Sequence, residues 1–268
     1  MISKSPDAPI GVFDSGLGGL TVLKSCLQAM PTERFVYLGD TARTPYGSKA
    51  HETICRYGVD CADFLAGHDV KFLVVACNTV SAHAMPDLEA RFDCPIVGTV
   101  DPAVRAALRS TRNRRVGVIG TEATINRGAY QEALKLADPA VEVVSQACPL
   151  FVPLVEQGMV SGEIVEKVVE LYLAGLKESG VDSVILGCTH YPLLSEAIRA
   201  YLGEDVSLVA CSDAVAASVV EILAEKDLGA RQDRARVEYF VTDAADRFDS
   251  LGRALLGLDD VHSRHIDL

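Results

Sequence analysis

The chain has 268 residues, of which 49% are hydrophobic and 23% are charged. This composition is typical of a globular protein with enough apolar material for two modest domains or one large one. A formal net charge of −12 argues against a nucleic-acid-binding protein, because such proteins show a basic patch or stripe. No apolar run approaches the roughly 18 residues that a membrane-spanning helix needs, so we expect neither nucleic acid nor a membrane as a partner.

The chain contains eight cysteines, and its first residues lack the apolar stretch of a secretory signal. We therefore predict a cytoplasmic protein whose cysteines are reduced thiols. No two cysteines are spaced as Cys-x-x-Cys, which weakens a zinc site and a thioredoxin-like redox site as interpretations, and we predict no metal site. Most of the eight are expected to be small buried apolar residues, since free cysteine is among the most buried residue types.

The first predicted strand, residues 9–14, ends in Asp14 and is followed by a glycine-rich turn at residues 15–20. Turns of this kind bring backbone N–H groups close to an anion. The turn matches neither G-x-x-x-x-G-K-[ST] nor G-x-G-x-x-G, so a phosphate site is not supported, and a tight turn without a ligand stays open. The presence of Asp14 favours a functional interpretation of this turn, because burying an acidic residue at the end of a strand costs free energy unless it has partners.

Strands and helices alternate from there up to residue 100. A second strand at residues 34–40 leads into a loop at residues 41–48, whose Pro, Gly and hydroxyl residues suit a turn that presents backbone amides. The other elements predicted in this part are an amphipathic helix around residues 54–65, a strand at 72–76, a helix at about 80–91 and a strand at 94–100.

Two predicted strands end in a cysteine that is followed by hydrogen-bonding side chains. One apolar run leads without a polar break into Cys77, and a second does so into Cys188. Such runs are typical of strands buried in a parallel sheet, whose ligands bind outside the carboxyl ends of the strands. The intervals from Gly11 to Cys77 and from Gly117 to Cys188 both run strand, helix, strand, helix, strand, cysteine. This repeat predicts an α/β fold of two pseudo-symmetric domains, each a mostly parallel sheet flanked by helices, with an active site in the cleft between them.

The last part of the chain is predicted to contain a helix at about 213–226, a strand at 237–242 and a helix at about 244–256. A polar tail follows these elements. We interpret His262 and His265 in this tail as disordered surface and not as a metal site.

Two thiols facing one cleft are compatible with four kinds of chemistry. Nucleophilic catalysis needs one cysteine with a histidine, as Cys188 has in His190, but it leaves Cys77 without a role. Redox cycling needs a disulfide and metal binding needs three or four ligands, and neither uses Asn78 and Thr79. A pair of acid and base groups on opposite faces of a carbon centre uses all of these residues. The residues alone do not decide among the four.

Several blocks of the sequence resemble glutamate racemases, members of the aspartate/glutamate racemase family. The blocks are collinear over residues 10–215 and comprise residues 12–20, 39–42, 45–47, 76–79, 147–151 and 187–193. The resemblance implies two α/β domains, with residues 1–99 and 213–268 in the first and residues 100–212 in the second. It also implies an isomerase that interconverts L- and D-glutamate without a cofactor and supplies D-glutamate for peptidoglycan synthesis.

The site residues that the resemblance implies fall into two groups. Cys77 and Cys188 correspond to the two acid/base residues, Cys77 for the proton of D-glutamate and Cys188 for that of L-glutamate. Asp14 and His190 resemble the groups that assist each thiol, and Glu156 is a further catalytic candidate. The substrate-binding residues are Asp14, Ser15, Tyr46, Gly47, Asn78, Thr79, Thr121, Thr189 and His190.

Other interpretations stay open, and the sequence also leaves open whether the chain forms a homodimer. A racemase of the same superfamily that acts on aspartate would be separated by measuring turnover on both amino acids. A non-catalytic amino-acid-binding protein built from two α/β lobes would not need the symmetric thiols. An enzyme dependent on pyridoxal phosphate is disfavoured, because no lysine can be placed in the predicted cleft.

Overall fold

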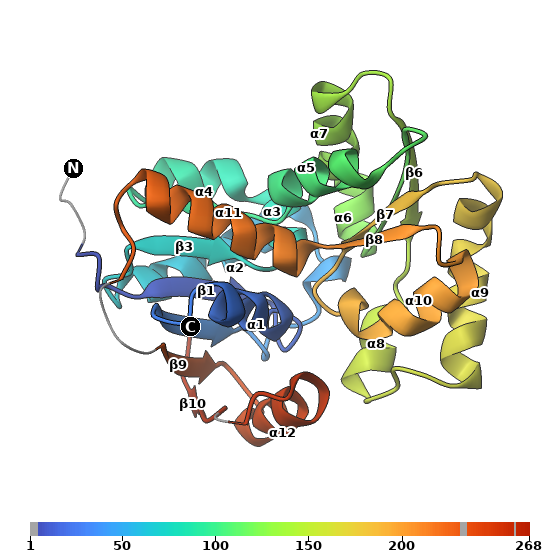
Figure 1. Cartoon of the computed structure of the whole chain (residues 1–268). Helices are drawn as coiled ribbons and strands as arrows, with labels where there is room; N and C mark the ends of the chain where they lie inside the picture. The colour runs from blue at the N-terminus through green and yellow to red at the C-terminus, as the bar shows by residue number, and fades with distance from the viewer. Residues whose placement is uncertain (1–4, 231–234, 260) are drawn as a thin grey trace.

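The computed structural model describes residues 5–230, 235–259 and 261–268. They form two β-sheets with helices packed on both faces of each (Figure 1). The first sheet has the strand order β10-β9-β2-β1-β3-β4 and the second has the order β6-β5-β7-β8. All neighbouring strands in both sheets are parallel. In the part of the chain that the structure describes, no helix is both long enough and apolar enough to cross a membrane.

The first sheet combines the beginning and the end of the chain. Its strands are β1 (Ile10–Asp14), β2 (Arg34–Gly39), β3 (Phe72–Val75), β4 (Ile96–Val97), β9 (Arg236–Val241) and β10 (Ser263–His265). Its helices are α1 (Leu20–Ala29), α2 (His51–Ala66), α3 (Asn78–His83), α4 (Met85–Arg91), α11 (Cys211–Glu225) and α12 (Ala245–Leu256), with a short 3-10 helix η1 (Tyr46–Ser48). Because side chains alternate along a strand, Ile10 and Val12 belong to the core shared with α1 and α11, whereas Phe13 belongs to the core shared with α2.

The second sheet is built from the middle of the chain. Its strands are β5 (Arg115–Gly120), β6 (Glu142–Ala147), β7 (Ser183–Gly187) and β8 (Ser207–Ala210). Its helices are α5 (Val100–Ser110), α6 (Glu122–Arg127), α7 (Ala129–Ala137), α8 (Phe151–Glu156), α9 (Glu163–Glu178) and α10 (Ser195–Leu202), with a 3-10 helix η2 (Tyr191–Leu194). The same alternation places Val118 in the core with α5 and α7, and Ile119 in the core with α9 and α10.

The two sheets repeat one connectivity. β1 lies between β2 and β3 with β4 beyond, and β5 lies between β6 and β7 with β8 beyond. The predicted fold class, mostly parallel sheets flanked by helices in two similar halves, is thereby confirmed. β9 and β10 join the first sheet beside β2, while the division into domains at residues 99 and 212 stays a prediction.

The chain crosses between the sheets twice, once from β4 into α5 and once from β8 into α11 (Figure 1). α11 returns to pack against α1 of the first sheet, and it also packs against α5. Both crossings therefore lie close together in space.

Two predicted elements differ in extent from those observed. The helix predicted at residues 80–91 is two helices, α3 and α4, that meet at Ala84. Pro86 lies in the first turn of α4 and lacks the N–H that a continuous helix would use, so a new helix starts there. The strand predicted at residues 94–100 is reduced to the two residues of β4, because only Ile96 and Val97 pair with β3.

The prediction of a disordered tail is wrong. Ser263–His265 forms β10, which pairs in parallel with β9. The ring nitrogen Nε2 of His265 lies 3.1 Å from the carbonyl oxygen of Thr242. An uncovered β9 would expose a row of unpaired backbone groups, and the tail covers this edge.

Candidate active site

Asp14 is held at the end of β1 by the glycine-rich turn that follows it. The residue is 1% exposed, and the backbone N–H groups of Gly16 and Gly19 donate to Oδ2 at 3.0 and 2.9 Å. A Cβ at Gly19 would lie 2.3 Å from Asp14 Cβ, so the turn can close over the carboxylate only with glycine there. Burial raises the pKa of Asp14, while the charge of His190 and these N–H groups offset part of the rise. The turn thus binds a carboxyl group of the protein itself.

Cys77 lies between the end of β3 and the start of α3. The residue is 4% exposed, and its thiol donates to Ser15 Oγ at 3.8 Å. Burial raises the pKa of Cys77 to about 12, the negative charge of Asp14 adds to the rise, and the backbone N–H groups of Val80 and Ser15 oppose it. Cys77 is therefore protonated at neutral pH.

Cys188 follows β7 and has a different neighbour. Its Sγ lies 3.8 Å from His190 Nδ1. On the other side of the ring, His190 Nε2 lies 3.4 Å from Glu156 Oε1, which is ion-pair distance without hydrogen-bond geometry. Burial alone would lower the pKa of His190, but the contacts with Cys188 and Glu156 raise it to about 10. The contact with His190 in turn lowers the pKa of Glu156 against the opposing effect of burial.

The ends of β1 and β7 meet directly. Thr189 Oγ1 donates to Asp14 Oδ1 at 3.4 Å, and Thr21 Oγ1 donates to the carbonyl oxygen of Thr189 at 3.1 Å. A Cβ at Gly18 would lie 2.2 Å from Thr189 Oγ1 and 2.6 Å from His190 Nδ1. Glycine at position 18 therefore allows this close approach. The sequence predicted the glycine-rich turn at residues 15–20 but not that Gly18 would pack against Thr189. The only indication of this contact was the high number of glycines in the turn.

A second contact between the halves joins α3 to α6. Thr79 Oγ1 lies 3.1 Å from Thr121 Oγ1 and 3.2 Å from Thr124 Oγ1. Thr121 also caps α6, because its hydroxyl accepts from the backbone N–H of Thr124 at 3.3 Å. A Cβ at Gly47 would lie 2.5 Å from Thr121 Cβ, so η1 packs tightly on this cluster. The fold brings the predicted residues Gly47, Thr79 and Thr121 together.

The hydroxyl of Tyr46 points away from the predicted site. It donates to Asp40 Oδ2 and lies 3.8 Å from Cys61 Sγ, inside the core of the first sheet. Thr242 Oγ1 donates to the other oxygen of Asp40 at 2.8 Å. A ligand in the cavity can therefore form hydrogen bonds only with the backbone of Tyr46. The anchored ring of Tyr46 holds the neighbouring Gly47 in place.

Ten of the predicted site residues line one cavity. They are Ser15, Tyr46, Gly47, Cys77, Asn78, Thr79, Thr121, Cys188, Thr189 and His190. Asp14 and Glu156 stand behind the lining, where they contact Thr189 and His190. Thr44, Pro45 and Val152 also line the cavity. Thr44 has a hydroxyl and lies in the predicted loop at residues 41–48, whereas the side chains of Pro45 and Val152 have no polar group that would have indicated a site.

The cavity is small and has no cationic lysine or arginine among the described residues that line it. Its volume of about 20 Å³ leaves room for about one water molecule. Hydroxyls, amides and backbone N–H groups are thus the available partners for a carboxylate, together with His190.

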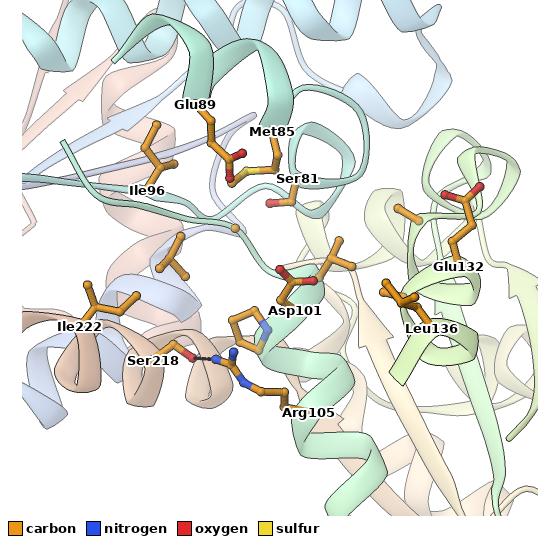
Figure 2. A pocket seen from close by; sticks show the side chains of 16 residues that line it. Ser81, Met85, Glu89, Ile96, Asp101, Arg105, Glu132, Leu136, Ser218 and Ile222 are labelled. Carbon is orange, nitrogen blue, oxygen red and sulfur yellow. Dashed lines mark hydrogen bonds between the residues drawn. The ribbon is translucent and has the colours of Figure 1, made fainter. Parts of the chain in front are cut away.

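A larger cavity, of about 450 Å³, lies beside the crossing from β4 to α5. Figure 2 shows the acidic residues Glu89, Asp101 and Glu132 around it and the hydrogen bond from Arg105 to Ser218 Oγ, 2.8 Å long. None of the described residues that line it is a cysteine or a histidine. Size alone therefore does not identify the active site, and the smaller cavity that contains both thiols is the candidate.

Comparison with known proteins identifies the family of this chain. The family described as Asp/Glu/Hydantoin racemase matches residues 10–221, which is most of the chain. The chain belongs to this family. It is therefore an isomerase, and the resemblance found in its sequence blocks is confirmed at the level of the family.

Individual relatives match over nearly the whole chain. A glutamate racemase from Geobacter metallireducens is 48% identical over 260 residues, which is 96% of this chain and 96% of that protein. The structure of glutamate racemase isoform RacE1 from Bacillus anthracis has a TM-score of 0.95 and 35% identity, covering 97% of this chain and 98% of that one. The structure of glutamate racemase from Francisella tularensis in complex with D-glutamate has a TM-score of 0.92 and 36% identity, covering 98% of both chains.

Proposed function

We propose that this chain is a cofactor-independent glutamate racemase that interconverts L- and D-glutamate by proton transfer at Cα with two thiols, Cys77 and Cys188. The observation that carries the proposal is the position of these thiols. Each follows the corresponding strand, β3 or β7, of one of two similar sheets, and both line one cavity. The relatives named glutamate racemase, and the Francisella structure with D-glutamate, support glutamate as the substrate.

In the proposed reaction, one thiolate removes the proton from Cα and the other thiol delivers a proton to the opposite face. The electron pair of the broken C–H bond stays on the substrate until it takes up the second proton. The first sulfur ends as a thiol and the second as a thiolate, so protons and charge balance and no electron acceptor is needed. Cys77 takes the proton of D-glutamate, and Cys188 takes that of L-glutamate.

The assisting residues differ on the two sides. Asp14 lies behind the turn that contacts Cys77, and its negative charge favours the protonated form of that thiol. His190 lies 3.8 Å from Cys188 Sγ, and its raised pKa keeps it cationic. A cationic neighbour stabilises negative charge that develops on a sulfur. Glu156 supports the cation from the far side of the ring.

The two carboxylates of the substrate are assigned to neutral donors. Ser15, Thr79 and Thr121, whose side chains carry hydroxyls, line the cavity together with Gly47, whereas the hydroxyl proton of Thr189 is donated to Asp14. Backbone N–H groups and hydroxyls placed on rigid elements can bind an anion without a lysine or an arginine.

Substrate entry requires the cavity to open. Its volume of about 20 Å³ leaves room for about one water molecule, whereas glutamate has ten non-hydrogen atoms. The structure thus corresponds to a closed site, and the residues around the thiols must separate for binding. Closure around the substrate would then exclude water from the proton transfer.

A pyridoxal phosphate mechanism would need a lysine at the site. Among the described residues that line the cavity there is no lysine, and the buried Lys71 instead pairs with Glu33 at 2.6 Å. A binding protein without catalysis would have no use for a thiol at each of two equivalent strand ends. A role in peptidoglycan synthesis, a cytoplasmic location and assembly as a homodimer remain predictions within this proposal.

The decisive experiment replaces each thiol by serine. Because a hydroxyl is a far weaker acid and base than a thiol near neutral pH, Cys77→Ser and Cys188→Ser should each lose at least the factor of about 10²–10⁴ that one acid/base group contributes. Circular dichroism of L- and D-glutamate, without added cofactor, measures the rate. Cys26→Ala, at a buried cysteine of α1 in the core of the first sheet, is the matched control and should keep its activity.

Isotope incorporation separates two bases from one. In deuterated water, product made from L-glutamate should carry deuterium at Cα from its first appearance, while unreacted L-glutamate keeps its original hydrogen. Near-wild-type racemisation by either serine variant, or early product that retains its original hydrogen, would refute the two-thiol reaction.

A further inference from the structure

The side-chain amide of Asn78 is anchored on one side and unpaired on the other. Asn78 follows Cys77 directly, is 2% exposed and lines the thiol cavity. Its Nδ2 donates to the hydroxyl oxygen of Tyr130 at 2.6 Å and to the sulfur of Cys211 at 3.2 Å. Its Oδ1 is buried and has no hydrogen-bond partner. A buried acceptor without a partner is costly, so this oxygen is a candidate ligand contact.

The two anchoring residues come from the region where the chain crosses between the sheets. Tyr130 lies on α7, and its hydroxyl is 3.0 Å from Thr99 Oγ1 at the crossing from β4 to α5. Cys211 is the first residue of α11, at the second crossing, and its thiol donates to the carbonyl oxygen of Leu186 at 3.3 Å. Leu186 lies in β7, the strand that leads to Cys188. The network therefore connects the residue after one thiol with the strand before the other.

The proton positions in this network fix the direction of the amide. Burial raises the pKa of Cys211 to about 11 and also raises that of Tyr130, so both groups keep their single proton. Because the proton of Cys211 is donated to Leu186, its sulfur is available only as an acceptor, which suits Nδ2. A reversed amide would place Oδ1 against this sulfur and lose that hydrogen bond. Nδ2 therefore faces Cys211 and Tyr130, neither of which lines the thiol cavity, and the oxygen remains for a ligand there.

We propose that Tyr130 and Cys211 are positioning residues, which hold the Asn78 amide so that its oxygen accepts a hydrogen bond from the α-ammonium group of the substrate. This inference rests on the proposed function, since it takes glutamate as the ligand. Glutamate with both carboxylates ionised has one hydrogen-bond donor, the ammonium group. An oriented acceptor in the cavity therefore recognises this group and no other part of the molecule.

The role of Tyr130 and Cys211 can be tested by comparing glutamate, the substrate, with glutarate as an inhibitor. Glutarate has the two carboxylates of glutamate but no amine. Tyr130→Phe and Cys211→Ala should each lower kcat/KM for glutamate about five- to tenfold, as the loss of one buried hydrogen bond implies, and should leave the inhibition constant of glutarate unchanged. Cys211→Ser, which keeps a donor and an acceptor, should recover most of the activity.

A double-mutant cycle adds a readout that does not depend on glutarate. If Tyr130 acts through Asn78, then Tyr130→Phe should cost nothing more in an Asn78→Ala background. Cys26→Ala removes a buried thiol that takes no part in the hydrogen bonds among Asn78, Tyr130 and Cys211, and it should change neither constant. Equal weakening of glutarate and glutamate, or additive effects of Tyr130→Phe and Asn78→Ala, would overturn the positioning role. Failure of the wild-type protein to racemise glutamate would instead overturn the proposed function on which the inference rests.

Discussion

Replacing Gly18 by alanine tests whether the contact between the ends of β1 and β7 controls catalysis. The φ angle of Gly18 lies outside the left-handed region, so its backbone accepts alanine. The new Cβ, however, would lie 2.2 Å from Thr189 Oγ1, where ordinary contact begins at 3.4 Å. The two strand ends must therefore separate by about 1 Å (3.4 − 2.2 = 1.2 Å) at this point. Thr189 is branched at Cβ and His190 is buried between Cys188 and Glu156, so neither can simply rotate away.

The displacement carries His190 and Cys188 with it. Because a misplacement of about 1 Å at a reacting centre can cost about 10²-fold in rate, we expect Gly18→Ala to lower kcat/KM for glutamate by about that factor. Overpacking costs about 1–3 kcal/mol, and for a chain of this length each kcal/mol lowers Tm by about 2–4 °C. The rate is measured by circular dichroism well below the Tm of the variant, so that unfolding does not contribute to the loss.

Gly175→Ala is the matched control. Gly175 lies inside α9, and a Cβ there meets no heavy atom within 4 Å. Alanine in a helix interior is favoured over glycine by about 0.5–1 kcal/mol, so this variant should be slightly more stable and fully active. A folded Gly18→Ala protein with the kcat/KM of the wild type would refute the reasoning, because the contact would then have no bearing on the site.

Two other residues lead to predictions of stability. His190 keeps its proton in the folded protein up to about pH 10, whereas an ordinary histidine loses it near 6.5, so its stabilising contribution is complete below pH 6.5 and is lost as the pH rises toward 10. We expect Tm to fall from pH 6.5 to 8.5 and to fall less in His190→Gln; identical slopes would contradict this. Lys71→Met should lower the free energy of unfolding in urea by about 3–5 kcal/mol, because it leaves Glu33 buried without its partner. A loss below about 1 kcal/mol would mean that the ion pair only balances its own desolvation.

The features that follow from local periodicity were predictable from the sequence. The apolar runs before Cys77 and Cys188 identify β3 and β7 as buried parallel strands, and the matching order of elements before each run predicts two similar sheets. Since ligands of parallel sheets bind at the carboxyl ends of the strands, the same pattern places both cysteines at one site. The lining of the thiol cavity agrees with this reasoning.

The features that depend on contacts between distant segments were not predictable. Nothing near Tyr46 in the sequence indicates that its hydroxyl would bond to Asp40 and leave the site. Cys211 belongs to the cysteines for which the sequence predicts only a buried apolar role, and its contact with Asn78 depends on the second crossing of the chain. The sequence of β10 has no apolar pattern that would predict a strand. This strand forms because its backbone pairs with the edge of β9.

The unlike neighbours of the two thiols bear on how one closed site can work in both directions. Burial and the charge of Asp14 raise the pKa of Cys77 to about 12, which keeps it ready as an acid. The same effects make its thiolate, once it has given its proton to the substrate, a strong base for the reverse reaction. Negative charge on Cys188 is instead stabilised by the cationic His190. In the proposed reaction, turnover therefore alternates between two forms of the enzyme, one with the proton on Cys77 and one with the proton on Cys188. The unlike neighbours of the two thiols leave the final ratio of the enantiomers unchanged, because L- and D-glutamate have equal free energy in solution.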